Sequence, residues 1–222
     1  MLINHHIQAG LARDRQATLR AEAAAARLAR QARPRRVAFG PAGTQAVLRD
    51  GSRVLIRQVQ SADAPLLADG FARLSATSRW MRFLTPKKEL SPAELSFLTD
   101  LDHHDHEALG ALDHRDGRGV GVARYVRQAD DPWSADIAVT IVDDWQGRGL
   151  GTELLARLSD RAREENIRSF TALVAAENVA VAGLLRNACA RLTGRESNTL
   201  EYEISLAPGA EQACVPGALL PG

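Results

Sequence analysis

Apolar and polar residues along the chain follow two different spacings. Short apolar runs rich in β-branched residues predict strands, and apolar residues three or four positions apart predict helices. The expected strands are 54–59, 108–112, 120–126, 137–142, 170–174 and 200–206, and the expected helices lie within 61–74, 91–98, 154–162 and 181–187. Because strands and helices are interspersed without an internal repeat, the pattern predicts one mixed α/β (α+β) domain over residues 51–206.

The residues before this domain have a different character. Residues 1–36 hold eight arginines and only two acidic residues, a net charge of +6, in an Ala-, Gln- and Leu-rich stretch that favours helix. We expect a basic helical arm over 1–36, a Pro- and Gly-containing linker over 37–50 and a flexible tail over 207–222. A solvated helix, contact with a partner or an anionic surface, and a homodimer formed through the arm all fit this composition.

The composition excludes several classes of protein. With 222 residues, 45% hydrophobic and 25% charged, the chain has the make-up of a soluble globular protein. It has no apolar run of about 18 residues, no signal-peptide pattern, and too few cysteines for a disulfide framework or a Cys-rich zinc site. We therefore expect a cytoplasmic protein with free thiols and no membrane span. The net charge of +1 leaves −5 on the residues after the arm, which argues against nucleic acid as a partner of the core.

The strongest chemical signal is a glycine-rich segment between an apolar strand and an amphipathic helix. It extends from Val142 to Thr152, with glycines at 147, 149 and 151. Alternating glycines let successive main-chain amides point into one concavity, and the following helix adds its positive N-terminal end. We expect a phosphate or diphosphate site here. The G-x-G-x-G spacing, with no Gly-Lys-Ser/Thr, excludes a Walker loop and differs from the dinucleotide-binding fingerprint.

The stretch Gln146-Gly-Arg-Gly-Leu-Gly151 resembles the Q/R-x-x-G-x-G/A motif of the GCN5-related N-acetyltransferase (GNAT) superfamily. Glu177-Asn178 resembles the next motif of that family, and segments 78–84 and 135–139 are similar to actinobacterial protein lysine acetyltransferase domains. The resemblance implies a mostly antiparallel central sheet, splayed at its centre and flanked by helices, with acetyl-CoA as co-substrate. The cofactor contacts that it implies are Thr140, Ile141 and Val142 at the strand edge, Gln146, Gly147, Arg148, Gly149, Leu150, Gly151 and Thr152 in the diphosphate cradle, and Asn178, which also suits a helix N-cap.

Acyl transfer to an amine needs a base, because a lysine amine with a pKa of about 10.4 is mostly protonated at neutral pH. Many members of the family use a Glu on the strand before the loop, and the resemblance places Asp136 there. Its side chain is one methylene shorter, so we expect a relay through water. The Tyr that is the family's usual general acid is replaced by Leu185. Water, Cys189 or Tyr202 as the acid, or departure of the thiolate without one, remain open.

The resemblance implies transfer of acetyl to a primary amine, with a protein lysine as the preferred acceptor. A small-molecule amine and a protein N-terminus are the alternative acceptors. A non-catalytic acyl-CoA sensor is the alternative class, because the Tyr is missing and the carboxylate is shortened. No metal is expected, since the histidines of segment 102–106 are adjacent and suit a polar loop. Segment 78–84 is expected either to pack Trp80 and Phe83 inward or to form a wall of the substrate site.

Overall fold

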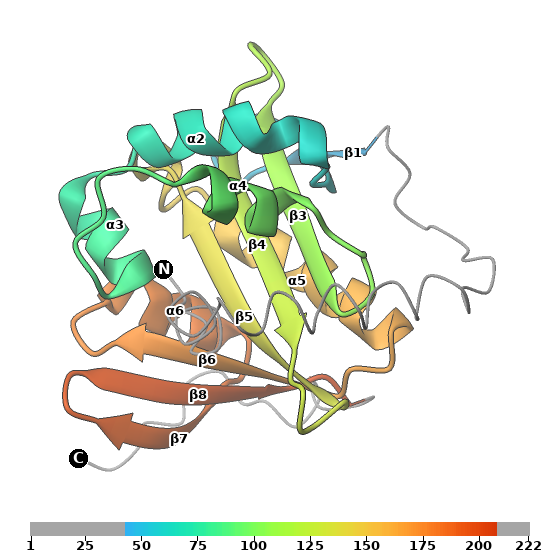
Figure 1. The fold of residues 1–222 in the computed structure, drawn as a ribbon, viewed down its shortest axis with the longest axis vertical. Coiled ribbons are helices and arrows are strands. Elements are labelled where there is room, and N and C mark those ends of the chain that lie inside the picture. The colour runs from blue at the N-terminus through green and yellow to red at the C-terminus, as the bar shows by residue number, and fades with distance from the viewer. Residues whose placement is uncertain (1–42, 208–222) are drawn as a thin grey trace.

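One eight-stranded sheet forms the centre of the protein (Figure 1). The computed structural model describes residues 43–207, so the expected arm over 1–36 and residues 208–222 of the expected tail lie outside the described residues. The strand order is β1-β2-β3-β4-β5-β6-β8-β7. The strands are β1 (Thr44–Val47), β2 (Arg53–Gln58), β3 (His106–Asp113), β4 (Gly119–Arg127), β5 (Ser134–Ile141), β6 (Ser169–Ala175), β7 (Arg191–Glu196) and β8 (Thr199–Ser205). Neighbouring strands are antiparallel, except that β5 and β6 are parallel.

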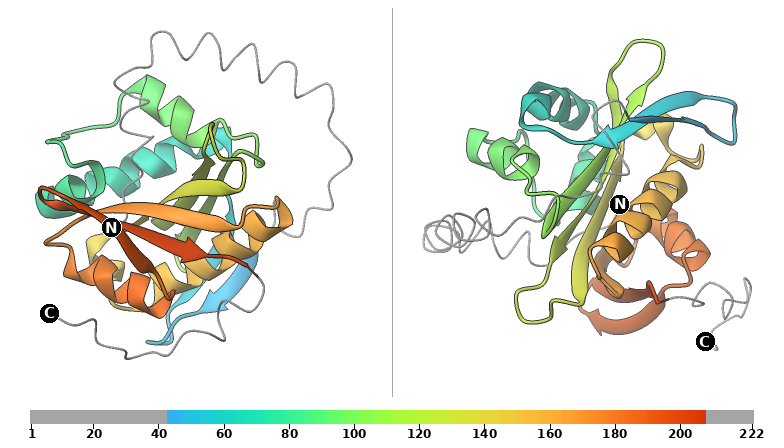
Figure 2. Two further views of the ribbon diagram at one scale, coloured as in Figure 1. Left: turned by 90° about the horizontal axis from the view of Figure 1, so that it is seen from below. Right: turned by 90° about the vertical axis from the view of Figure 1, so that its right-hand side faces the viewer.

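Helices cover both faces of the sheet (Figure 2). One face carries the short 3-10 helix η1 (Ser61–Asp63), α2 (Ala64–Ala72), α3 (Ala76–Phe83) and α4 (Pro92–Thr99), and the other carries α5 (Leu150–Glu164) and α6 (Val179–Asn187). Local sequence signals fix several of these helices. At α4, the Ser91 hydroxyl accepts from the Glu94 amide while the Glu94 carboxylate accepts from the Ser91 amide, and Pro92 takes the first helical position.

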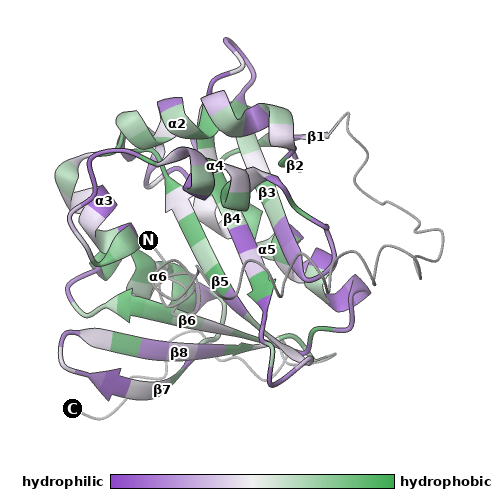
Figure 3. Cartoon of the chain, in the orientation of Figure 1, coloured by the Kyte–Doolittle hydropathy of each residue, from purple (hydrophilic) through white to green (hydrophobic). Residues whose placement is uncertain are grey.

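The expected mixed α/β architecture is confirmed, but two edge strands are missing from the sequence-based expectation. β1 pairs with β2 and lies inside segment 37–50, where we expected a linker. β7 pairs only with β8, and most of its residues are exposed. Figure 3 shows the difference, with β5 mainly hydrophobic and β7 mainly hydrophilic. Edge strands of this kind bury little apolar surface, so they carry no alternating pattern from which a strand can be predicted.

The sheet opens between its two central strands, as the resemblance implies. β5 and β6 pair only at their first residues, from Ser134↔Ser169 to Asp136↔Thr171. Beyond that point the two strands diverge, which is visible in Figure 1 as the angle between β5 and β6. The edge of β5 that faces β6 therefore has unpaired main-chain groups from Ile137 onward. An open strand edge of this kind can bind an extended, amide-containing ligand.

The main core lies between the sheet and α5. Odd-numbered residues of β5, including Ile137 and Val139, pack with Leu154 and Leu158 of α5. Even-numbered residues of β5 face the opposite side, because side chains alternate along a strand. Among residues 43–207, none of the helices has both the length and the apolar character that crossing a bilayer requires.

Candidate active site

The glycine-rich segment leaves a row of main-chain donors unused. Gly147 and Gly149 have φ values of 75° and 91°, in the left-handed region that L-residues with a side chain rarely adopt. Gly149 is also the N-cap of α5. None of the amides from Gly147 to Thr152 donates a hydrogen bond within residues 43–207. A row of free amides at the positive end of a 15-residue helix is suited to an anion such as a diphosphate.

These amides belong to a cleft of about 500 Å³ that continues into the opening between β5 and β6. Its walls come from the ends of β5 and α6, from the glycine-rich segment and from α3. Of the residues expected to bind cofactor, those that line the cleft are Ile141, Gln146, Gly147, Gly149, Leu150, Gly151, Thr152 and Asn178. The sequence-based expectation thus locates most of the cleft.

Thr140 and Val142, two of the expected cofactor contacts, do not line this cleft. Both line a separate cavity on the other face of the sheet. The Val142 amide also donates to the Val120 carbonyl at 3.0 Å, and Gln128 at the far end of β4 donates likewise to Ser134. Because main-chain groups alternate between the two edges of a strand, even-numbered residues of β5 bond to β4 and odd-numbered ones face the opening. Ile141, which was expected at this edge, and Val139, which was not, therefore present their amides to the cleft.

Two further observations concern the cradle itself. The Gln146 amide donates to the Asp143 carbonyl at 3.2 Å, so the free donors begin at Gly147. The Arg148 side chain turns away from the cleft, bonds to the Asp144 carbonyl and to Ser52, and lies 4.7 Å over the Trp145 ring. Only the main chain of Arg148 is therefore available to an anion in the cradle.

A hydrogen-bond network links the start of the glycine-rich segment to α3 and to the residue before it. The Gln146 side-chain amide donates to the Ile141 carbonyl at 3.1 Å and to Asp143 at 3.0 Å. The Asp143 carboxylate also accepts from the Ser75 amide at 2.7 Å and from the Ser78 hydroxyl. Burial raises the pKa of Asp143, but the hydrogen bonds from Ser78 and Ser75 outweigh it, so the net pKa lies below the ordinary value of 3.8.

This network predicts a pH dependence of stability. A carboxylate whose pKa is lowered by folding contributes stability above about pH 4, and the contribution is lost as the pH falls through the folded-state pKa. Asp143→Asn is therefore expected to reduce the steepness with which the free energy of unfolding falls below about pH 4. Ser78→Ala should act in the same direction, because it removes a donor to the same carboxylate. Denaturant titrations from pH 7 to pH 3 measure this dependence. If the free energy of unfolding falls equally steeply below about pH 4 in both variants and the wild type, the prediction is contradicted.

Asn178 caps α6 and borders the cleft, so both of its expected roles are compatible with the structure. Its side-chain oxygen accepts from the Val181 amide at 3.3 Å. Leu185, at the position of the family's Tyr, is buried in the core rather than exposed to the cleft. The two alternative acids are not among the residues that line the cleft: Tyr202 packs against the core, and Cys189 lines a neighbouring cavity.

Asp136 lies where β5 and β6 separate, at the last paired position of the two strands. Its carboxylate is buried and accepts from the Gln128 side-chain amide at 2.8 Å and from the Thr171 hydroxyl. It faces the side of the sheet opposite α5 and is not among the residues that line the cleft. Val139 lies three positions further along β5, roughly 10 Å along a strand. At this separation, proton transfer to Asp136 from a group beside Val139 requires a water relay.

Helix α3 contributes to the cleft, which is one of the two roles expected for segment 78–84. Thr77, Ser78 and Met81 line the cleft, so segment 78–84 does form one wall of the site. Phe83 is buried as expected, but Trp80 is 39% exposed, so its predicted inward packing is wrong. The Trp80 indole donates to Glu177 at 3.3 Å and links α3 to the segment before α6. The sequence of this segment, rich in Ser and Arg and with helical spacing, predicts a helix. It does not show which side of the helix lies against the cleft.

The histidines of segment 102–106 have protein partners. His103 lies 2.7 Å from the Glu107 carboxylate, His104 bonds to Glu165, and His106 contacts Arg124. In the described part of the chain no group of three His, Cys, Asp or Glu side chains is arranged to hold a metal ion.

A splayed sheet whose open edge leads to free amides at a helix N-terminus is the architecture of an acyl-CoA-dependent transferase. The sequence profile of the acetyltransferase (GNAT) domain matches residues 53–188, and the chain belongs to this family. The resemblance stated from the sequence is thereby confirmed. Family membership makes the protein an acyltransferase with acetyl-CoA as co-substrate, so the enzyme is favoured over the non-catalytic sensor.

Relatives of this chain include proteins named as acetyltransferases. Acetyltransferase PA5475 of Pseudomonas aeruginosa is 40% identical over 139 residues, which cover 62% of this chain and 74% of that protein. Acetyltransferase Pat of Mycolicibacterium smegmatis is 28% identical over 183 residues, 82% of this chain, but the chain spans only 54% of its length. The crystal structure of the GNAT domain of S. lividans PAT has a TM-score of 0.69 and 28% identity, and the match covers 73% of this chain and 96% of that domain.

Proposed function

We propose that the protein transfers the acetyl group of acetyl-CoA to a primary amine by direct attack, with a protein lysine as the preferred acceptor. The observation that carries this proposal is the row of free amides from Gly147 to Thr152, continuous with the open edge of β5. Acetyl-CoA supplies an activated acetyl group as a thioester. The chain's own residues bind its diphosphate, align its amide-containing arm and receive the proton of the amine.

The cradle would hold the diphosphate through the amides from Gly147 to Thr152. Hydrogen bonds from main-chain amides to an anion are about twice as strong as neutral ones. The amides of Val139 and Ile141, which face the opening, would bind the carbonyls of the pantetheine arm. One of these strand amides would also polarise the thioester carbonyl, as donors of an oxyanion hole do. Asn178, the N-cap residue of α6, would contact the same arm.

Asp136 is the proposed general base, acting through water. It is the residue that the resemblance places at the base position, and it lies at the apex of the opening. Hydrogen bonds from Gln128 and Thr171 fix its orientation. Leu185, Tyr202 and Cys189 offer no proton to the cleft, so the thiolate would leave without a protein acid. A thiol has a pKa of only about 8.5, which makes its thiolate an adequate leaving group near neutral pH.

The test is amine-dependent release of CoA thiol by the full chain. Thiol should appear when acetyl-CoA is mixed with a lysine-containing peptide, and kcat/KM should be higher for the peptide than for free lysine or small alkylamines. The same peptide with its lysine ε-nitrogen already acetylated is the control and should give no release above background. Equal background release with every amine would contradict the transferase proposal. Preference for a small amine would instead support the alternative acceptor.

A cytoplasmic location and an arm-mediated homodimer remain predictions.

A further inference from the structure

Two arginines are almost completely buried between the sheet and the helices on the side opposite α5. Arg82 of α3 is 4% exposed and Arg124 of β4 is 2% exposed. Burial of a guanidinium is costly, and proteins normally offset it with a carboxylate at hydrogen-bonding distance. Neither arginine has a carboxylate within 4.0 Å among residues 43–207. Two positive charges are therefore buried together without a counter-charge from the described part of the chain.

The partners of these arginines are neutral and incomplete. Arg124 donates to His106 Nε2 at 3.1 Å and to the Leu98 carbonyl at 3.1 Å. Burial lowers the pKa of His106 to about 3, so the ring is neutral and its Nε2 accepts a hydrogen bond from Arg124. Arg82 lies 4.9 Å over the Phe83 ring, and its Nη1 has no hydrogen-bond partner in the described residues. A buried donor left without a partner costs roughly 1–3 kcal/mol, more when it is charged.

The carboxylates around this region are engaged elsewhere. Asp63 pairs with Arg57 at 2.6 Å, Glu94 pairs with Lys87, and Asp69 pairs with Arg73 and Arg118. Burial lowers the pKa of Arg82 to about 10, and burial together with the charge of Arg82 lowers that of Arg124 to about 9. Both arginines therefore stay charged at neutral pH, and their mutual repulsion is not relieved by deprotonation.

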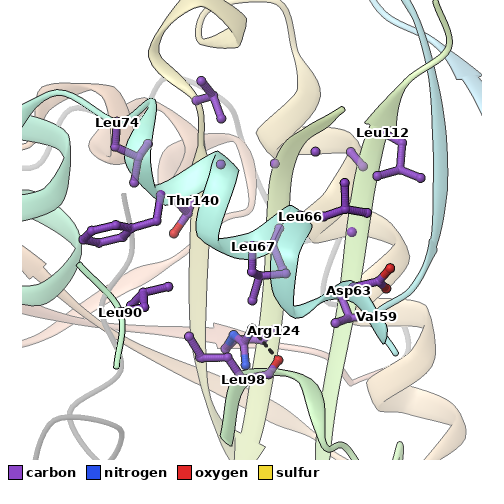
Figure 4. Close-up of a pocket in the computed structure, with 18 of the residues that line it drawn as sticks. Val59, Asp63, Leu66, Leu67, Leu74, Leu90, Leu98, Leu112, Arg124 and Thr140 are labelled. Atoms are coloured by element: carbon purple, nitrogen blue, oxygen red, sulfur yellow. Dashed lines mark hydrogen bonds between the residues drawn. The ribbon is translucent and has the colours of Figure 1, made fainter. Parts of the chain in front are cut away.

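Both guanidiniums border a cavity of about 90 Å³ with mainly apolar walls. Figure 4 shows side chains from α2, including Leu66 and Leu67, around this space, and Arg124 at its edge with its bond to Leu98. Leu74, Phe71, Phe83 and Leu90 also belong to the apolar part of the lining. A space of this size has room for more than one water molecule but not for a nucleotide. Its lining combines the guanidiniums of Arg82 and Arg124 with a hydrocarbon surface, and the Arg57–Asp63 ion pair also borders it.

The cavity is distinct from the cofactor cleft. Thr77, Ser78 and Met81 of α3 line the cleft, whereas Arg82 and Phe83 of the same helix line the cavity. On β5 the division is the same, with Val139 and Ile141 on the cleft and Thr140 on the cavity. The requirements of acetyl-CoA binding therefore do not account for the two buried arginines.

We propose that this cavity binds a small aliphatic carboxylate, with its oxygens between Arg82 and Arg124 and its alkyl group against the leucines of α2. A carboxylate matches the planar guanidinium in a bidentate geometry, and burial of an alkyl group against leucine contributes favourable transfer energy. Inorganic phosphate fits less well, because its four hydrated oxygens would face apolar walls.

The test measures the melting temperature of the full chain without acetyl-CoA, so its result does not depend on the transferase proposal. Millimolar propionate and isobutyrate should raise the melting temperature saturably, by about 3 °C or more at saturation. Propionamide, the neutral isostere, and sodium chloride at matched ionic strength should not. Arg82→Met should abolish the carboxylate effect, whereas Arg115→Met, which removes an equal charge from an exposed turn, should retain it.

Each other outcome overturns the proposal. Equal stabilisation by chloride would show a general anion effect, and retention of the propionate effect in Arg82→Met would place the binding elsewhere. If Arg82→Met fails to fold, Arg124→Lys and calorimetric titration of the wild type with isobutyrate decide instead. The absence of any heat of binding at carboxylate concentrations on the order of tens of millimolar would contradict the assignment.

Discussion

Replacing Gly147 with alanine is expected to weaken acetyl-CoA binding about tenfold or more. Gly147 has a φ of 75°, and an L-residue pays roughly 1–2 kcal/mol to adopt this region. Relief of that strain would rotate the first free amides of the cradle away from the diphosphate. Loss of one charge-assisted hydrogen bond costs about 1.5–3 kcal/mol, and 1.4 kcal/mol corresponds to a factor of ten in affinity. Calorimetric titration with CoA measures the change directly.

The chain offers a closely matched control in Gly117. Its φ is 73°, and a Cβ at either Gly117 or Gly147 would meet nothing within 4 Å, so the backbone strain of the two substitutions is comparable. Gly117→Ala, in the turn between β3 and β4, should reduce stability similarly but leave the affinity for CoA unchanged. Equal affinities for CoA in the two variants would show that the conformation at Gly147 does not shape the binding site.

Asp136→Asn is expected to reduce kcat/KM for the amine about 100-fold or more, in the range typical of general-base removal. The affinity for acetyl-CoA should stay within about twofold, because the main-chain contacts of the cleft do not involve this side chain. The loss should shrink as the pH rises toward the pKa of the amine, since solution then supplies the neutral nucleophile. Steady-state kinetics from pH 6.5 to pH 9.5 with a lysine peptide test all three statements.

Asp160→Asn is the control for this variant, because it neutralises an exposed carboxylate on α5 that pairs with Arg163. Its kinetics should match those of the wild type. A loss below about threefold for Asp136→Asn, equivalent to about 0.7 kcal/mol, would remove Asp136 from the role of base. A loss of the same size at every pH would indicate a structural effect of the substitution rather than loss of a proton acceptor.

The parts of the fold that sequence predicts best are those determined by local chemistry. The capping box at Ser91, the apolar β5 strand and the alternating glycines each involve interactions between residues close in the chain. β1 and β7 were missed because edge strands with exposed, polar residues have no apolar alternation. Their formation depends on pairing with β2 and β8 and not on their own pattern.

The candidate site was predictable to the extent that the main chain defines it. The glycine positions indicated the cradle, but the choice among Thr140, Ile141 and Val142 depended on which strand edge faces the opening. That alternation is set by pairing with β4, which is distant in sequence: Thr140 pairs with Val122, and the Val142 amide bonds to the Val120 carbonyl. The burial of Arg82 and Arg124 was equally inaccessible, because an arginine in a helix or strand usually extends to solvent. Only the packing of α2, α3 and α4 on the sheet reveals it.

The central claim is that free amides at the start of α5 bind the diphosphate of acetyl-CoA. Amide resonances of ¹⁵N-labelled full chain, recorded during titration with CoA, test this most directly. Hydrogen bonding to a phosphate oxygen should move the amide proton signals of Gly147, Gly149 and Gly151 downfield, with the same saturation as the calorimetric binding curve, while that of Gly117 stays in place. Saturated binding with the three glycine signals unmoved, or no binding at millimolar CoA, would contradict the account.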